Sequence, residues 1–113
     1  MNQEKLSARA IEIAELIISQ NFAQAYRLLA ADAQDDFTLD SFQQAYQEMV
    51  AYFYEDGAKV NITLGEVILE DLGDDEVSAF VPVLSNNQHD EFEALTMLIN
   101  SDFDIIEFDF GRP

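Results

Sequence analysis

The spacing of apolar residues changes once along this chain of 113 residues, near Lys59. Before that point apolar residues recur every three or four positions, which is the period of an amphipathic helix. After it they alternate with polar residues, which is the period of a strand with one buried face. Helical and strand patterns segregated in this way predict an α+β fold, with three N-terminal helices packed on a curved four-stranded antiparallel sheet.

Three helices are predicted in the first half of the chain. Leu6 and Ile13 belong to the apolar stripe of the first helix. Thr38 or Asp40 can cap the third helix, and Gln43 stands at the reciprocal capping distance from Asp40. The predicted helices span residues 3–20, 22–33 and 40–54.

Four strands of a meander are predicted in the second half, at residues 59–70, 76–84, 91–99 and 102–110. Gly65 interrupts the alternation in the first strand, and the adjacent pair Ile105 and Ile106 interrupts it in the last. Both interruptions predict β-bulges, which bend a sheet. Pro82 cannot donate a ladder hydrogen bond, so we expect it to face a sheet edge or a bulge.

Length and composition predict one domain over residues 1–113 with a single hydrophobic core. The chain has no cysteine, so disulfides, thiolate metal sites and cysteine nucleophiles are excluded. The N-terminus lacks a secretory pattern, and no segment reaches the roughly 18 apolar residues of a membrane span. A cytoplasmic location is therefore expected.

The charge is strongly one-sided, with 23 Asp and Glu against 5 Lys and Arg and a formal net charge of −18. Between residues 60 and 111 there are thirteen Asp or Glu and no Lys or Arg. Such a surface favours basic partners, and it disfavours direct contact with nucleic-acid phosphates and anionic membranes. The competing interpretation is a solvated surface that serves only solubility.

Residues 21–32, with the sequence NFAQAYRLLAAD, follow a predicted helix that ends in a short polar turn. They resemble the second helix of the nuclear-transport-factor-two-like superfamily, and the order of elements is similar to its cystatin-like cone over nearly the whole chain. The resemblance implies a pocket between helices and sheet, and pairing of two copies through the outer sheet face. The superfamily contains isomerases, dehydratases, binding proteins and bacterial toxin-immunity proteins, and none of its enzyme motifs matches a position here, so the resemblance selects no function.

Three groups of residues carry side chains that catalytic or metal sites use. His89 beside Asp90 has the elements of a general base, the acids of residues 70–76 could ligate calcium or magnesium, and Asp35 with Asp36 could form a carboxylate pair. A solvated turn histidine, an acidic hairpin turn and a chance neighbour pair are the simpler interpretations. No catalytic residue, metal or cofactor is therefore predicted.

The first functional hypothesis is a non-enzymatic acidic domain that binds a basic protein, as an immunity or inhibitor protein does. Its predicted binding residues are acids of the strands and turns, namely Glu70, Asp71, Asp74, Asp75, Glu76, Asp102, Asp104, Glu107 and Asp109. Long-range attraction by these groups would speed association, and salt would weaken it.

Two rival hypotheses use the same fold. One is a small-molecule pocket protein, or an isomerase-like or dehydratase-like enzyme, with a pocket lined by Phe22, Tyr26, Phe42, Tyr46 and Phe53. The other is a homodimer through the outer sheet face. Its basis is the expectation that Leu95, Met97 and Ile99 face away from the helices and need cover.

Overall fold

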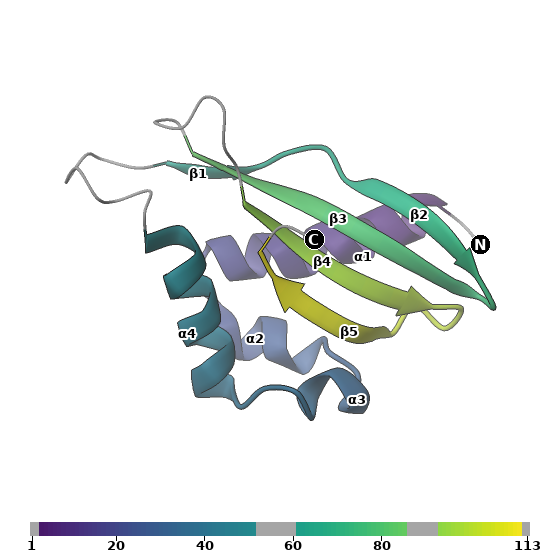
Figure 1. Cartoon of the computed structure of the whole chain (residues 1–113), viewed down its shortest axis with the longest axis horizontal. Helices are drawn as coiled ribbons and strands as arrows, with labels where there is room; N and C mark the ends of the chain where they lie inside the picture. Colours follow the sequence, from purple (N-terminus) through teal and green to yellow (C-terminus); the bar gives the residue numbers. More distant parts are fainter. Residues whose placement is uncertain (1–2, 52–60, 86–92, 112–113) are drawn as a thin grey trace.

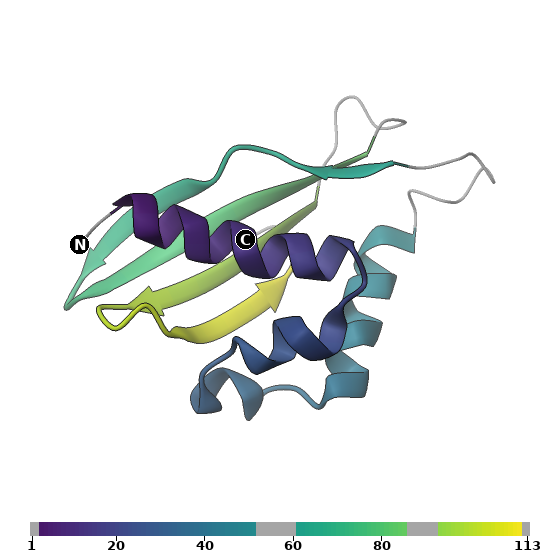
Figure 2. The same cartoon turned by 180° about the vertical axis from the view of Figure 1, so that it is seen from behind.

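The computed structural model describes residues 3–51, 61–85 and 93–111, and all statements below concern these ranges. The elements are α1 (Gln3–Ile18), α2 (Phe22–Arg27), α3 (Ala31–Gln34), α4 (Leu39–Val50), β1 (Ile62–Leu64), β2 (Ile68–Gly73), β3 (Glu76–Ser85), β4 (Glu93–Asn100) and β5 (Ile105–Phe110). The strands form one open antiparallel sheet, and α1 crosses one of its faces (Figure 1 and Figure 2). The predicted α+β class is confirmed, with five strands in place of four.

The longest strand, β3, organises the sheet. It pairs with β4 on one side and with both β1 and β2 on the other, while β5 pairs with β4 at the opposite edge (Figure 1). The predicted strand at residues 59–70 is therefore wrong as a single element, and its part at residues 59–60 lies outside the described residues. Leu64 pairs with Val83 and Ile68 pairs with Phe80. The three residues between Leu64 and Ile68 therefore lie opposite the two residues between Phe80 and Val83. This extra residue is the bulge that Gly65 predicts.

Glycine is required at position 65 because two backbones approach closely there. The Gly65 amide donates to the Pro82 carbonyl over 2.9 Å. A Cβ atom at position 65 would lie 2.9 Å from the Pro82 Cβ atom, closer than carbon atoms normally pack. Within a strand a residue's nitrogen and carbonyl point to the same side, so the missing N–H of Pro82 faces the bulge, as predicted.

The second predicted bulge is also confirmed. Leu98 pairs with Glu107 while Ile99 pairs with Ile105, which leaves Ile106 as the extra residue of β5. The bulge changes which alternate residues of the strand face the core. Ile105 is buried before the bulge, whereas after it the even-numbered residues face the core.

The last strand begins at Ile105 rather than at residue 102. The side-chain oxygen Oδ1 of Asn100 accepts hydrogen bonds from the amides of Asp102 and Asp104, each over 3.0 Å. These bonds hold a tight turn where the apolar pattern predicts the start of a strand.

The predicted second helix, at residues 22–33, is wrong as a single element and is instead the two short helices α2 and α3. Between them Leu29 forms a parallel bridge with Ile105, and the Ala30 amide donates to the Ile105 carbonyl over 2.8 Å. The Ala30 amide thus bonds to the edge strand β5, whereas in an unbroken helix it would bond to a carbonyl of the helix itself. Leu29 and Ala33 are buried, so the apolar pattern fits both arrangements.

Helix α4 begins with a capping box made by Thr38 and Ser41. The Thr38 hydroxyl oxygen accepts from the Ser41 amide over 3.1 Å, and the Ser41 oxygen accepts from the Thr38 amide over 2.8 Å. The cap at Thr38 is confirmed, and the alternative box from Asp40 to Gln43 is wrong. The first helix ends at Ile18 rather than at residue 20. Residues 52–54 and 91–92, also predicted in elements, lie outside the described residues.

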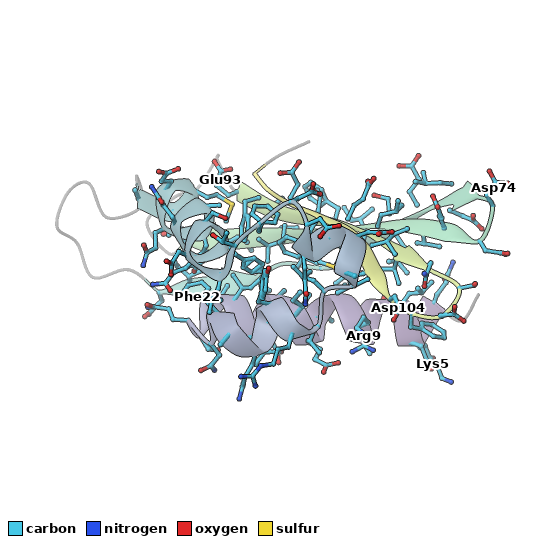
Figure 3. All side chains as sticks on the ribbon, turned by 90° about the horizontal axis from the view of Figure 1, so that it is seen from below. Lys5, Arg9, Phe22, Asp74, Glu93 and Asp104 are labelled. Atoms are coloured by element: carbon cyan, nitrogen blue, oxygen red, sulfur yellow. The ribbon has the colours of Figure 1, made fainter. Side chains whose placement is uncertain are left out.

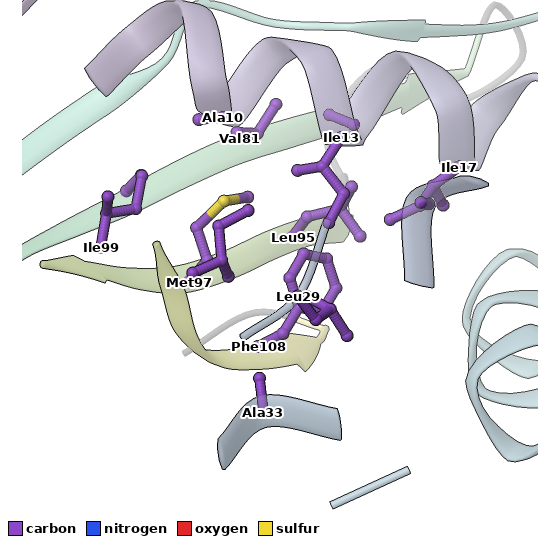
Figure 4. Packing of buried hydrophobic residues seen from close by; sticks show 14 of the residues in the cluster. Ala10, Ile13, Ile17, Leu29, Ala33, Val81, Leu95, Met97, Ile99 and Phe108 are labelled. Carbon is purple, nitrogen blue, oxygen red and sulfur yellow. The ribbon is translucent and has the colours of Figure 1, made fainter. Parts of the chain in front are cut away.

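The core lies between α1 and the inner face of the sheet (Figure 4). Leu95, Met97 and Ile99 of β4 pair with the buried Val81, Ala79 and Val77 of β3, and all six belong to the same core cluster as the inner face of α1. The prediction that these β4 residues face away from the helices is wrong. Since β4 is apolar on both faces, its sequence pattern leaves the facing undetermined. The homodimer hypothesis therefore loses this support.

Candidate protein-interaction surface

The sheet face that points away from α1, called the outer face below, carries two rows of side chains that cross β2, β3, β4 and β5. The residues in register are Glu70, Ser78, Leu98 and Glu107 in the first row, and Ile68, Phe80, Thr96 and Asp109 in the second. Neighbouring strands lie about 4.8 Å apart, so each row spans about 14 Å.

The acidic side chains of these rows lie on the two outermost strands, and apolar side chains lie on the central strands and, at Ile68, on β2. Glu70, Glu107 and Asp109 are exposed on the two outermost strands of these rows. Phe80 and Leu98 are half-buried on the central strands. Ile68, on β2, is 59% exposed. An apolar centre with a charged margin is the usual composition of a protein-binding surface.

The hairpin turns at one end of the sheet bring together most of the other predicted acids. Glu76 pairs with Asn100, so the β2–β3 turn lies beside the β4–β5 turn. Asp74 and Asp75 form the first turn and Asp102 is in the second (Figure 1). The predicted acids at this end of the sheet, called the turn cluster below, are Asp71, Asp74, Asp75, Glu76, Asp102 and Asp104. The fold therefore places three of the nine predicted acids, Glu70, Glu107 and Asp109, on the outer face, and the other six at one end of the sheet. Asp71 pairs there with the buried Val77 and so lies on the inner face.

The described basic residues lie on the helices instead. Lys5 and Arg9 are on α1 and Arg27 is on α2 (Figure 3). The Arg9 Nε atom donates to the Phe103 carbonyl over 3.2 Å, and the Lys5 Nζ atom lies 5.8 Å from the centre of the Phe103 ring. The five strands carry no Lys or Arg, so no basic side chain of the sheet offsets the carboxylates of the outer face.

A shallow trough crosses the outer face, with a volume of about 350 Å³. Its lining includes Leu72 on the β2 side, Thr96 on β4, and Glu107 with Asp109 on β5. Asp36, from the connection between α3 and α4, adds a third carboxylate on the β5 side. The sequence does not predict this placement, because Asp36 stands out there only as the neighbour of Asp35 in a candidate carboxylate pair.

A second hollow, called the β5 groove below, lies between α4 and the end of β5. Its volume is about 480 Å³, and it is lined by Phe37, Ala45, Glu48, Met49, Glu93, Asp109, Phe110 and Gly111. Glu48 and Glu93 are absent from the predicted set because they come from a helix and from another strand. Only the fold brings them beside Asp109.

The candidate pocket aromatics pack against one another and against the aromatic residues of β5. The Phe22 and Tyr46 ring centres lie 5.6 Å apart, and those of Tyr26 and Phe42 lie 5.8 Å apart. The Tyr26 hydroxyl donates to the Phe37 carbonyl over 2.7 Å. These contacts are typical of a packed core. The fifth candidate, at position 53, lies outside the described residues.

One of these aromatics, Tyr46, also lines an open cavity of about 750 Å³ between α1, α4 and β1. The described lining residues are Ile18, Gln20, Tyr46, Gln47, Val50, Asn61, Ile62 and Thr63. None of them is a carboxylate, a histidine or a lysine, so this lining holds no acid–base pair of the kind that an isomerase or a dehydratase uses.

The other candidate catalytic and metal sites gain no support from the described residues. Asp35 and Asp36 are both exposed, so neither has the apolar burial that would separate the roles of two carboxylates. His89 and Asp90 lie outside the described residues. In the part of the chain that the structure describes, no group of three or more His, Cys, Asp or Glu is arranged to hold a metal ion. Every described helix is also too short or too polar to cross a membrane.

No protein-family model matches this chain, and no curated protein matches it.

Proposed function

We propose that this protein is a non-enzymatic acidic interaction domain that binds a basic protein through the outer face and the turn cluster. The observation that carries the proposal is the arrangement of the two outer rows. Exposed carboxylates lie at both ends of the first row and at the β5 end of the second row, whose β2 end is Ile68. Neutral and apolar side chains lie between them, and the strands supply no basic residue to offset the charge.

The two parts of this surface have different physical roles. The turn cluster extends from the end of the sheet, where its field reaches a partner before contact and raises the association rate. Phe80 and Leu98 offer apolar area that loses water on binding, which slows dissociation. The acids Glu70 and Glu107 would then pair with basic residues at the margin of the interface.

A basic partner suits this surface better than a second copy of the chain. Two copies would each bring a net charge of −18, and their outer faces would place Glu70, Glu107 and Asp109 near like charges. The homodimer stays a hypothesis, and a dimeric mass by light scattering at physiological salt would support it.

Immunity and inhibitor proteins of the cytoplasm are the class that this account favours. An acidic domain can occupy the phosphate-binding surface of a basic enzyme, because carboxylates at the margins of a sheet can take the place of phosphates. This class also occurs in the nuclear-transport-factor-two-like superfamily, whose resemblance to this chain stays a proposal.

The alternative proposal is a small-molecule pocket at the cavity beside Tyr46. Its volume of about 750 Å³ lies in the range of ligand sites. Its described lining suits a neutral ligand that binds through amide and hydroxyl groups rather than a substrate that undergoes acid–base chemistry.

Co-purification from the native host tests the proposed function. The bait is the wild-type chain, a triple variant of the outer face (Glu70→Gln, Glu107→Gln, Asp109→Asn), or a control variant of α1 (Glu4→Gln, Glu12→Gln, Glu15→Gln) with the same change in charge. We expect the wild type and the control to recover one basic protein at low salt, and the outer-face variant to lose it. Equal recovery by both variants would show that net charge alone attracts the partner.

A further inference from the structure

The β5 groove has an apolar floor and an acidic rim. Phe37, Ala45, Met49 and Phe110 form the floor, and each of them is half-buried. The rim carries Glu48 of α4, Glu93 of β4 and Asp109 of β5, so three separate elements converge on one hollow.

Two aromatic rings give the floor its chemistry. The ring centres of Phe37 and Phe110 lie 5.9 Å apart with an angle of 89° between the ring planes. Because both side chains are only half-buried, part of each remains accessible from the groove. A cation held near an aromatic face is attracted by the electron density of the ring, and a flat guanidinium group can also stack on it.

Two of the three rim carboxylates, Glu48 and Asp109, are held in place by local bonds rather than by basic side chains. A Glu48 oxygen accepts from the side-chain amide nitrogen Nε2 of Gln44 over 3.1 Å, and the Asp109 Oδ1 atom accepts from the Phe110 backbone amide over 3.2 Å. Among the described residues, Arg9 forms an ion pair with Glu12 on α1, away from this groove. The carboxylates of the rim are therefore available to an external cation.

We propose that the β5 groove receives an arginine side chain of the basic partner, an inference that rests on the proposed function and names the anchoring residue of that partner. An arginine matches both parts of the groove, because its methylene stem and flat guanidinium suit the apolar floor while its N–H groups reach two carboxylates at once. Lysine is a smaller and more strongly hydrated charge that gains less from an aromatic floor. The groove shares Asp109 with the trough of the outer face, so an arginine bound here lies at the edge of the same interface.

The proposal is tested without the partner, by NMR titration of the ¹⁵N-labelled chain with N-acetyl-L-arginine N-methylamide. We expect saturable shifts of the Met49, Glu93, Phe110 and Gly111 amides. The matching citrulline compound, which has the same shape without the charge, should give no saturable shift. The matching lysine compound should bind about threefold more weakly, as expected for loss of a stacked cation at an exposed site.

Three variants localise the binding. Glu93→Gln and Phe110→Leu should each weaken arginine binding about three- to tenfold, and the dispersion of their spectra shows whether they remain folded. Glu4→Gln removes one carboxylate from the first turn of α1, outside both proposed binding surfaces, and should leave the affinity unchanged within about twofold.

Shifts that spread evenly over the turn cluster and α1, or equal affinity for arginine and lysine, would overturn the proposal. Binding by an Arg112→Gln variant but not by the wild type would also overturn it, because Arg112 of the chain itself would then occupy the groove. The proposed function is judged separately by co-purification. Arginine binding in the groove with no partner captured by the outer face would contradict that function alone.

Discussion

Glu70 of β2 and Glu107 of β5 stand at opposite ends of one row of the outer face, with Ser78 and Leu98 between them. The row spans three strand spacings of about 4.8 Å, so the two carboxylates frame a neutral strip about 14 Å wide. A basic segment that lies across the strip can pair with both of them.

The turn cluster should act mainly on the rate of association. In the triple variant Asp74→Asn, Asp75→Asn, Glu76→Gln, the on-rate for the basic protein recovered by co-purification should fall about tenfold at low salt, while its off-rate changes little. Surface plasmon resonance measures both rates. The α1 variant Glu4→Gln, Glu12→Gln, Glu15→Gln is the matched control, and an unchanged on-rate in the turn variant would refute the role of the cluster.

The β2–β3 turn should become more stable with glycine at its second central position. Asp74 and Asp75 have φ angles of 53° and 61°, a conformation in which residues other than glycine are strained. Asp75→Gly should raise the free energy of unfolding by about 0.5–1 kcal/mol, measured by urea denaturation. Asp102→Gly removes the same charge from a turn residue without a positive φ and should give no gain. Equal effects of the two substitutions would show that charge repulsion, rather than backbone strain, limits the turn.

Alanine should be poorly tolerated at position 65. Its Cβ atom would lie 2.9 Å from the Pro82 Cβ atom, so one backbone must move. We expect Gly65→Ala to lower the free energy of unfolding by about 1–3 kcal/mol. The cost should be smaller in a Pro82→Gly background, where the opposing atom is missing. A cost that is the same in both backgrounds would mean that the contact with Pro82 is not its cause.

Truncation of two leucines of β4 should report which face is buried. Leu95→Ala should lower the free energy of unfolding by about 2–5 kcal/mol, because Leu95 is fully buried against the core. Leu98→Ala, on the outer face, should cost less than about 1.5 kcal/mol. Urea denaturation of the two variants measures the difference, and a larger cost at Leu98 would reverse the facing of the strand.

The features that the sequence predicts correctly are those with a local physical cause. The change of period near Lys59 separates helices from strands. The bulges at Gly65 and at Ile105–Ile106 are recognisable because each one shifts the alternation within its own segment. The cap at Thr38 is likewise decided by a neighbour three residues away.

The features that the sequence does not predict depend on partners that are distant in the chain. The break after α2 follows from a backbone bond between Ala30 and Ile105, which no local pattern records. The facing of β4 is set by its register with β3, since both of its faces are apolar. Glu48 and Glu93 join Asp109 in the β5 groove only once α4 and β5 are side by side.

NMR mapping of the basic protein on the ¹⁵N-labelled chain shows which surface of the chain binds it. If the outer face is the binding surface, the amides of Glu70, Phe80, Leu98 and Glu107 shift or broaden on binding while those of α1 stay unchanged. Changes centred on α1, or on the cavity beside Tyr46, would contradict the account.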